Sequence, residues 1–202
     1  MYRLIALGLG YLLGGIQTAI LYGRFKGIEI REHGSGNAGA TNTLRVLGKK
    51  AALIVFLGDI LKAVLAVIIA SWLLFPQMTP LAGLYAGIGA IIGHSYPLFF
   101  KFKGGKGIAV TVGAIYFIDM RIGLIVSLIF IVSAWLTRIV SLSSLLLTGF
   151  IPVLLYVFYK GAPNIVEIVV LGAVIAAITA YRHKANIIRL MNGTEAKLGS
   201  KK

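Results

Sequence analysis

The sequence contains no cysteine and only six acidic residues among 202, and only 13% of its residues are charged. The absence of cysteine excludes a scaffold held by disulfides. The six scattered carboxylates exclude a site that needs a cluster of acidic metal ligands. Soluble domains carry about 25% charged residues, so this shortage of charge points away from a soluble protein.

The chain is instead rich in apolar residues and in positive charge. Hydrophobic residues make up 58% of it, 25 residues are glycine, and the mean hydropathy is +0.93. Twenty Lys and Arg residues give a net charge of +14, which in a soluble protein would suggest nucleic-acid binding. The segments between the charges are too apolar for that reading. We therefore predict a protein that spans the lipid bilayer several times and binds no nucleic acid.

Seven apolar runs are candidates for membrane spans, which need about 20 residues and tolerate about 17. They cover residues 3–23, 51–74, 80–97, 107–118, 122–137, 139–159 and 162–181. The fourth run is short, but fusing it with the fifth would place Asp119 and Arg121 at mid-membrane. Each charge there would cost about 2.5–3.5 kcal/mol. We predict an all-α membrane protein of seven transmembrane helices in a single domain, residues 1–202.

The distribution of Lys and Arg predicts the orientation, because cytoplasmic loops of membrane proteins carry an excess of them. With seven spans and the N-terminus outside, 16 of the 20 cations fall on the cytoplasmic side, Lys201 and Lys202 among them. Fusing the two short runs would leave 10 inside and 8 outside. We therefore predict an outer N-terminus and a cytoplasmic C-terminus. Glycines such as Gly10, Gly14 and Gly89 are expected to serve close helix packing.

The first loop, residues 32–45, consists largely of Gly, Ser, Thr and Asn and ends at Arg45. Glycine allows consecutive backbone N–H groups to converge on an anion, and Arg45 can add a charge-assisted grip on phosphate. The alternative is a flexible linker, which has no need for amide and hydroxyl groups beside an Arg. We expect a phosphate site in this loop.

The second loop, residues 93–107, contains Lys103-Gly-Gly-Lys106-Gly directly before an apolar run. The N-terminus of a helix suits phosphate, because its N–H groups are unpaired. The spacing is not that of a nucleotide-hydrolysing loop, and no acidic Mg²⁺ ligand lies nearby. The alternative is a basic loop that only sets the topology, with aromatic residues such as Phe99 as interfacial anchors.

In the C-terminal segment, residues 182–197, helical spacing places Arg182, Asn186 and Arg189 on one stripe with His183 beside Asn186. Gly193 is expected to end that helix. The alternative is an amphipathic helix lying on anionic lipid.

Further polar residues lie at or within the spans. Asp59 and Lys62 are three residues apart in the second span and can form an ion pair, either purely structural or as a strut for the exit of the first loop. Arg138 and Ser141 mark the only polar cluster at the third cytoplasmic turn.

All three histidines, His33, His94 and His183, fall on the predicted cytoplasmic side. The supply of donors exceeds what one phosphate needs, which indicates a diphosphate or two phosphorylated molecules held together. A site for phosphates and apolar chains at a membrane face suggests synthesis of lipid head groups.

Three motifs carry a family resemblance: SGNAGATN at residues 35–42 with Arg45, GHSYPLFFKFKGGKG at 93–107, and RHKANIIRLMNGTEAK at 182–197. In composition, order and spacing they resemble the motifs of bacterial acyl-phosphate:glycerol-3-phosphate acyltransferases of the PlsY type. The resemblance covers nearly the whole chain.

The resemblance implies a seven-span enzyme of the inner membrane with its active site on the cytoplasmic face. It would transfer an acyl group from acyl phosphate to the 1-hydroxyl of sn-glycerol 3-phosphate, giving lysophosphatidic acid and phosphate in phospholipid synthesis. No metal, cofactor, acyl carrier protein or coenzyme A is expected.

The His-x₄-Asp motif of many soluble acyltransferases is absent. The fifth residues after the three histidines are Ala38, Phe99 and Ile188. We therefore predict direct attack of the glycerol hydroxyl on the acyl carbonyl, with cations and N–H donors stabilising the developing charge. His183, with Asn186, is the favoured base or orienting group, and a substrate phosphate oxygen is its rival. A Ser35 nucleophile is the less favoured alternative.

The two phosphate sites are assigned by motif. For glycerol 3-phosphate we predict Ser35, Asn37, Thr41, Asn42, Arg45 and Arg182. For acyl phosphate we predict His94, Lys103, Gly104, Gly105, Lys106, Gly107, Arg138 and Ser141.

Two other functions compete with this one. A transporter of a phosphorylated anion should carry basic residues to the midplane, where this chain offers only Asp59 and Lys62. A CDP-alcohol phosphatidyltransferase needs a cluster of Asp residues for metal, and Asp59 and Asp119 are the only two in the chain.

Overall fold

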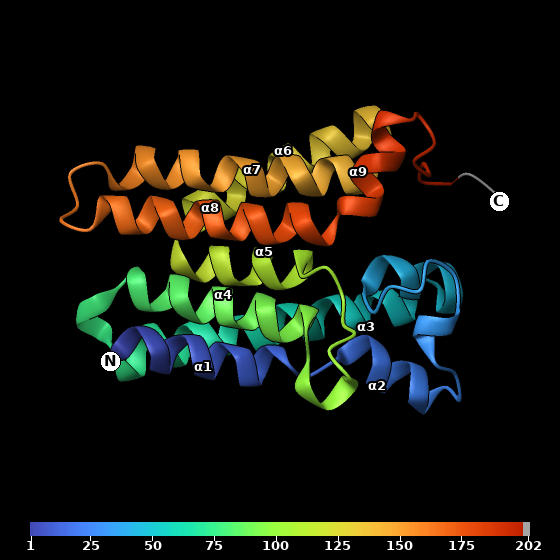
Figure 1. The fold of residues 1–202 in the computed structure, drawn as a ribbon, viewed down its shortest axis with the longest axis horizontal. Coiled ribbons are helices and arrows are strands. Elements are labelled where there is room, and N and C mark those ends of the chain that lie inside the picture. Colours follow the sequence, from blue (N-terminus) through green and yellow to red (C-terminus); the bar gives the residue numbers. More distant parts are fainter. Residues whose placement is uncertain (200–202) are drawn as a thin grey trace. The chain divides into compact units, whose positions relative to one another are not determined.

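A computed structural model describes residues 1–199 of the chain (Figure 1). Over these residues the regular structure is entirely helical, which confirms the all-α prediction. Lys201 and Lys202, counted above among the cytoplasmic cations, lie outside the described residues. The chain forms two compact units, Met1–Ile118 and Asp119–Lys202. The single domain stays a prediction.

The first unit contains five α-helices, with long loops before α3 and α5. The helices are α1 (Tyr2–Gly14), α2 (Thr18–Phe25), α3 (Ala40–Ile68), α4 (Leu81–Ser95) and α5 (Ile108–Ile118). A π-helical turn, Ile69–Leu74 (η2), continues α3, and 3₁₀ turns occur at Ile30–Glu32 (η1), Pro76–Met78 (η3) and Leu98–Phe100 (η4).

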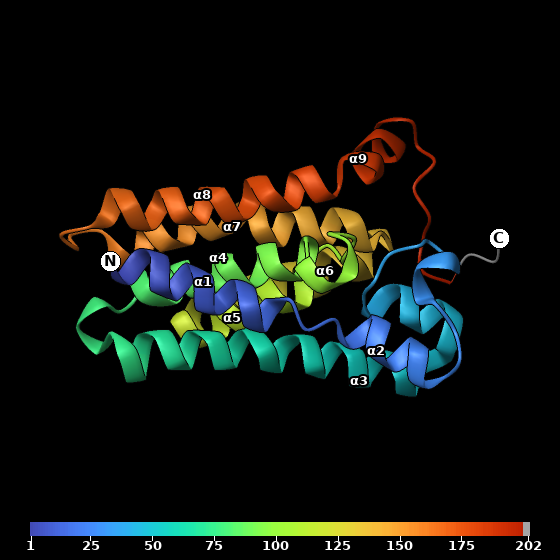
Figure 2. The same ribbon diagram turned by 60° about the horizontal axis from the view of Figure 1, so that its bottom comes forward.

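The closest packing in the first unit is between α1 and α4, which lie side by side in Figures 1 and 2. A Cβ on Gly10 would overlap the carbonyl oxygen of Ala86, and one on Gly14 the carbonyl oxygen of Ala90. Gly89 on α4 meets the backbone of α1 in the same way. The glycines therefore let the two backbones touch, which confirms their predicted packing role.

Helix α4 forms the centre of the first unit. Thirteen of its fifteen residues are buried, and it packs against α1, α3 and α5. A helix that is apolar on all sides is expected to be buried among other helices. Because α4 ends at His94 and Ser95, its C-terminus carries polar groups to the base of the second loop.

The second unit contains α6 (Met120–Thr137), α7 (Val140–Tyr159), α8 (Ile165–Arg182) and α9 (Lys184–Met191). Helix α7 packs against both α6 and α8. The short α9 turns away from the axis of α8 (Figure 2). The break falls at His183, whose φ of −102° and ψ of 10° are not those of a regular helix.

Among the described residues, five helical segments are long and apolar enough to cross a membrane. They are Tyr2–Phe25, Ala40–Leu74, Met120–Thr137, Val140–Tyr159 and Ile165–Arg182. Helix α5 is apolar but shorter, and α4 has 15 residues. The number of seven spans and their orientation therefore remain predictions.

The predicted break between the fourth and fifth runs is confirmed. Helix α5 ends at Ile118 and α6 begins at Met120. Between them Asp119 caps α6, because its Oδ1 accepts a hydrogen bond of 2.9 Å from the Arg121 backbone N–H. Arg121 also donates to Asp119 Oδ2 from Nη2 at 2.7 Å. Asp119 and Arg121, whose charges argued against one fused helix, therefore form the beginning of α6, with Asp119 as its cap.

At two places the helices do not coincide with the predicted apolar runs. The first apolar run is not one helix, because α1 ends at Gly14 and α2 begins at Thr18. The second helix begins at Ala40, eleven residues before the predicted residue 51, and bends at Gly48, whose φ is 81°. Residues 40–47 therefore form a short helix before the apolar run, and the end of the first loop is helical.

Candidate functional site

The first loop is organised around the side chain of Asn42, which is wholly buried. Its Oδ1 accepts hydrogen bonds from the Ser35 backbone N–H at 2.7 Å and from Ser35 Oγ at 3.1 Å. Its Nδ2 donates to the carbonyl oxygens of Ile30 at 3.1 Å and His33 at 3.0 Å. With its amide engaged on both sides, Asn42 holds the loop together. Its predicted role as a substrate ligand stays a prediction.

The other predicted residues of this loop are more accessible. Ser35 and Arg45 are exposed, and Asn37 and Thr41 are half-buried. Ser35 donates its hydroxyl hydrogen to Asn42, so its oxygen has only lone pairs left to offer a partner. Arg45 lies on the short helix 40–47, where its exposed guanidinium remains suited to phosphate.

His33 and Arg31 hold the loop from its other side. His33 is exposed, with Nδ1 3.0 Å from the carbonyl oxygen of Glu29. Arg31 forms an ion pair with Glu29, 2.8 Å from Nε to Oε1. The same guanidinium donates from Nη1 to the carbonyl oxygens of Phe100 at 3.2 Å and Lys103 at 3.3 Å. Arg31 therefore fastens the segment that leads into the first loop to the second loop.

The second loop folds back onto the C-terminus of α4. The N–H of Gly104 donates to the carbonyl oxygen of Ser95 at 3.2 Å, and the N–H of Gly105 donates to that of His94 at 3.1 Å. These two N–H groups are therefore engaged, and the predicted nest of free glycine N–H groups is wrong at Gly104 and Gly105. Lys103 is exposed and Lys106 half-buried, so the lysines are the groups of this loop suited to phosphate.

Gly107 and Gly105 are required as glycines for different reasons. Gly107 precedes α5, as predicted, with a φ of +83°, a conformation that favours glycine. Its carbonyl oxygen accepts the N–H of Thr111 at 2.8 Å and so begins the helix. A Cβ on Gly105 would overlap the His94 ring at Nε2 and lie against the carbonyl oxygen of Ala38.

The predicted ion pair in the second span is confirmed, and it includes a third residue. Lys62 Nζ lies 2.8 Å from Asp59 Oδ1 and 2.9 Å from His94 Nδ1. Thr18 Oγ1 donates to Asp59 Oδ1 at 3.1 Å. With 3% of its surface exposed, His94 is a buried member of this cluster. Its predicted place among the direct phosphate ligands stays a prediction.

In the second unit, Glu195 gathers three side chains of the predicted site region. Oε1 accepts hydrogen bonds from Ser141 Oγ at 2.7 Å and from Asn186 Nδ2 at 2.6 Å. Oε2 accepts one of 2.6 Å from Arg189 Nε. Glu195 is a residue of the third motif that was not among the predicted site residues. The sequence signal that could have identified it is that Glu195 is the only acidic residue after Glu167 and lies among basic and amide side chains.

The surroundings of Glu195 change its acidity. Partial burial acts to raise the pKa of this carboxyl, but the hydrogen bonds from Asn186, Ser141 and Arg189, with the charge of Arg189, hold it below its usual value. Glu195 is therefore a carboxylate at neutral pH. Because Ser141 donates its hydroxyl hydrogen to Glu195, it has no donor left for the phosphate it was predicted to bind.

His183 stands at the junction of α8 and α9, buried with 2% of its surface exposed. Its Nδ1 lies 2.8 Å from the carbonyl oxygen of Thr179, which can only accept. Nδ1 therefore carries a proton, and in the neutral ring Nε2 carries a lone pair. Nε2 is thus the atom that can accept a hydrogen bond or a proton.

The predicted stripe of Arg182, Asn186 and Arg189 does not lie on one helix. The break at His183 leaves Arg182 at the end of α8 and the other two residues on α9. The predicted stop at Gly193 is confirmed, since α9 ends at Met191 and Gly193 has a φ of +67°.

Arg138 ends α6 in the left-handed region, with a φ of 58°, and its side chain is exposed. Its carbonyl oxygen accepts the N–H of Leu198 at 2.7 Å. The C-terminal segment therefore returns to the turn between α6 and α7. No group of three or more His, Cys, Asp and Glu residues that could hold a metal occurs within residues 1–199.

Comparison with known proteins shows the family. The model of the family described as glycerol-3-phosphate acyltransferase matches residues 4–193. A glycerol-3-phosphate acyltransferase of Thermoanaerobacter sp. (strain X514) is 41% identical over 204 aligned positions, which cover 100% of this chain and 98% of the relative. One from Clostridioides difficile (strain 630) is 43% identical, covering 100% of this chain and 97% of the relative.

Solved structures agree with these relatives. A crystal structure of PlsY (YgiH), an integral membrane glycerol 3-phosphate acyltransferase, in its glycerol 3-phosphate form is 35% identical, with a TM-score of 0.85. It covers 98% of this chain and 96% of that one. The lysophosphatidic acid form gives 34% identity and a TM-score of 0.83. The chain described here therefore belongs to the glycerol-3-phosphate acyltransferase family.

Proposed function

We propose that the chain takes its acyl group from acyl phosphate and works at the cytoplasmic face of a bacterial inner membrane. As a member of its family it is an acyltransferase of phospholipid synthesis that acylates glycerol 3-phosphate and yields lysophosphatidic acid. The observation that carries the choice of donor is the joining of two polar loops, each with cationic side chains, by Arg31. Two phosphorylated substrates need two such sets of cations.

The chemistry of the donor fits the residues of this chain. Acyl phosphate is an activated anhydride, so its carbonyl needs no prior transfer to a protein nucleophile. The chain contains no cysteine. The hydroxyl of Ser35 donates its hydrogen bond to the amide oxygen of Asn42, which is not a general base. We therefore propose direct transfer without acyl carrier protein, coenzyme A or a metal.

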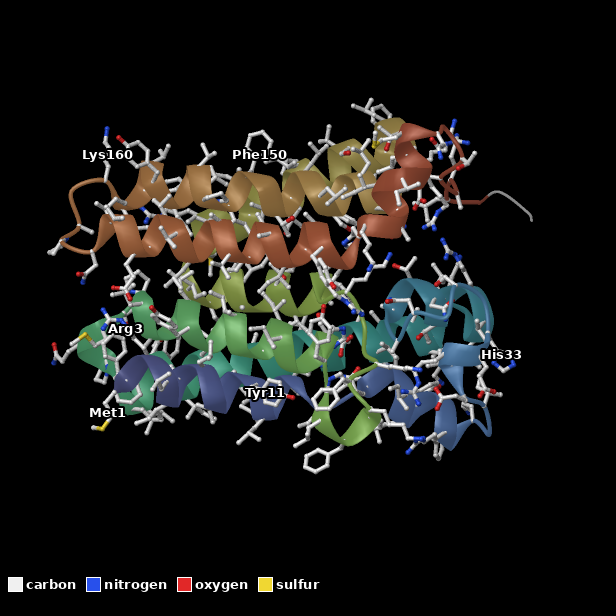
Figure 3. All side chains as sticks on the ribbon, viewed as in Figure 1. Met1, Arg3, Tyr11, His33, Phe150 and Lys160 are labelled. Atoms are coloured by element: carbon white, nitrogen blue, oxygen red, sulfur yellow. The ribbon has the colours of Figure 1, made fainter. Side chains whose placement is uncertain are left out.

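We propose seven spans with an outer N-terminus. The distribution of Lys and Arg along the sequence supports this orientation. In the first unit, Arg3 and His33 lie at opposite ends (Figure 3). The two polar loops would then face the cytoplasm while Arg3 faces outward. Helices α4 and α5 are short, but they pack against other helices of the first unit. With the five longer candidates they would make seven spans.

We propose that glycerol 3-phosphate binds at Ser35, Asn37, Thr41 and Arg45 of the first loop. We propose that Arg182, His183 and Asn186 of the third motif, residues 182–197, also bind glycerol 3-phosphate. Acyl phosphate is assigned to Lys103 and Lys106, with Arg138. The remaining predicted residues act through structure. They are Asn42, His94, Gly104, Gly105, Gly107 and Ser141.

In the proposed reaction, the 1-hydroxyl oxygen of glycerol 3-phosphate attacks the acyl carbonyl carbon. An ester C–O bond forms, and the bond from the carbonyl carbon to the phosphate oxygen breaks, releasing inorganic phosphate. The proton of the hydroxyl passes either to His183 Nε2, which carries a lone pair in the neutral ring, or to a substrate phosphate oxygen. Cationic side chains stabilise the negative charge that develops on the carbonyl and the leaving group.

The test is direct. Purified protein is incubated with acyl phosphate and labelled glycerol 3-phosphate, with no second protein, and labelled lysophosphatidic acid is measured. Its formation supports the proposed donor. A requirement for acyl carrier protein or coenzyme A would overturn it. Labelled substrate accumulating unchanged inside vesicles would instead favour a transporter.

A further inference from the structure

A buried polar cluster in the first unit has no part in the proposed chemistry. It consists of Asp59 and Lys62 on α3 and His94 on α4, and we name it the Asp59–Lys62–His94 cluster. The side chains of all three are at most 4% exposed. Burying charges is costly unless each is paired and hydrogen-bonded. The hydrogen bonds that offset this cost connect the cluster to the rest of the first unit.

Lys62 uses every donor that an ammonium group has. Its Nζ lies 2.8 Å from Asp59 Oδ1, 2.6 Å from the carbonyl oxygen of Ile16 and 2.9 Å from His94 Nδ1. An ammonium has three donors and no acceptor, so Nδ1 must accept. The carboxylate of Asp59, 2.8 Å from Nζ, favours the charged form of Lys62, so we place the proton on Lys62. The neutral His94 ring must then carry its own proton on Nε2.

The other edge of the His94 ring faces the two polar loops. A Cβ on Gly105 would overlap the ring at Nε2 and lie against the carbonyl oxygen of Ala38. Gly105 belongs to the second loop and Ala38 to the first. The proton that Lys62 places on Nε2 is therefore directed to where the two loops meet.

The backbone carbonyl of His94 also binds the second loop. Its carbonyl oxygen accepts the N–H of Gly105 at 3.1 Å and the amide of Gln17 at 3.1 Å. Gln17 is in the break between α1 and α2, close to Ile16, whose carbonyl binds Lys62. The ring and the backbone of one residue thus join the break after α1, the buried ion pair and the second loop.

We infer that Asp59, Lys62 and His94 are positioning residues for the second loop. Lys62 holds His94 in the tautomer protonated at Nε2, and the ring in that state seats Gly105 so that Lys103 and Lys106 are presented to a substrate phosphate. The inference rests on the proposed function for the substrate that the loop serves. The tautomer rests on the contacts of the cluster and on a charged Lys62, and it needs no substrate.

The kinetic test uses the double variant Asp59→Ala with Lys62→Met. It removes both charges together and so leaves no unpaired buried ion. We expect the KM for one of the two phosphorylated substrates to rise about tenfold, the effect of roughly one hydrogen bond, with kcat changed less than threefold. Ser71→Ala, a buried position of the same unit whose Oγ has no hydrogen-bond partner among the described residues, is the matched control and should leave both KM values unchanged.

The spectroscopic test reads the tautomer without any substrate. The chain has only three histidines, so protein labelled with ¹⁵N in histidine rings gives few signals, and His33→Ala helps to assign them. We expect the wild-type His94 ring to be protonated at Nε2 and bare at Nδ1, and to become a tautomer mixture in the double variant. A wild-type ring protonated at Nδ1 would overturn the tautomer assignment.

The two readouts separate the possible failures. If the double variant loses the single tautomer while both KM values stay unchanged, the positioning role is wrong. If the wild type does not use acyl phosphate, the proposed donor fails while the ring spectrum still tests the tautomer. Should the double variant not fold, His94→Gln replaces it. Its amide can donate near the position of Nε2, and it should retain a KM within about threefold of wild type, whereas His94→Phe should not.

Discussion

The side-chain amide of Asn186 donates a hydrogen bond of 2.6 Å to Oε1 of Glu195, nine residues further along the chain. The same oxygen accepts the hydroxyl of Ser141 at the start of α7. One carboxylate thus connects α9 to α7 and turns the amide nitrogen of Asn186 toward itself.

Replacing Glu195 should disturb the second unit. In Glu195→Gln the acceptor of three hydrogen bonds loses its charge, and we expect a loss of about 2 kcal/mol in the free energy of unfolding together with most of the activity. Thermal unfolding in detergent and the acyl-transfer assay measure both. Glu32→Gln removes the same charge at an exposed site and should change neither. Equal behaviour of the two variants would show that Glu195 does not hold the unit.

The same carboxylate predicts a dependence of stability on pH. Because the pKa of Glu195 is lowered in the folded state, its contribution is complete above the unfolded value of about 4.3 and is lost as the pH falls through the lower folded value. The stability difference between wild type and Glu195→Gln should therefore shrink as the pH is lowered below about 4. Unfolding curves from pH 7 to pH 3 measure it, and a constant difference would contradict the prediction.

Two asparagines of the first loop should respond differently to mutation. Asn42→Ala removes four hydrogen bonds from a wholly buried side chain and should cost about 2–4 kcal/mol of stability. Asn37→Ala, at a half-buried position proposed to bind substrate, should raise the KM for glycerol 3-phosphate with little loss of stability. Unfolding and steady-state kinetics on both variants test this, and a stable Asn42→Ala enzyme would refute the role given to Asn42.

The contact of α1 with α4 gives a sharp pair of glycine variants. Gly10→Ala places a methyl group on the carbonyl oxygen of Ala86 and should destabilise the first unit by about 1–3 kcal/mol. Gly8→Ala, on the same helix with no atom within 4 Å of the added Cβ, should be neutral or stabilising by up to about 1 kcal/mol. Comparing the two unfolding temperatures decides, and a neutral Gly10→Ala would contradict the packing.

The proposed chemistry uses no metal. The rate of lysophosphatidic acid formation should therefore be the same in buffer with and without EDTA. Activity lost in EDTA and restored by a divalent cation would require a metal in the reaction.

Local patterns in the sequence predicted much of the fold, and contacts between distant residues were the part that they could not predict. The pairing of Asp59 with Lys62 follows from helical spacing, and the break at Asp119 follows from the cost of burying its charge. His94 lies 32 residues from Lys62, and only the packing of α4 on α3 brings them together. Its place beside the Lys-Gly-Gly-Lys motif therefore suggested a phosphate ligand instead.

The same reason explains the errors in the loops. A run of small polar residues predicts backbone N–H groups that are free to bind an anion. The N–H groups of Gly104 and Gly105 are instead used by the last carbonyls of α4, and the amide of Asn42 by its own loop. Hydrogen-bond partners of this kind depend on where a helix ends, which residue types alone do not show.

The touching backbones of α1 and α4 also restrict how a lipid substrate can arrive. Where Gly10 and Gly14 rest on α4, no space remains for a methylene chain between the two helices. An acyl donor diffusing in the bilayer therefore cannot slide in through that seam. A lipid substrate would therefore have to reach its site between other helices of the chain.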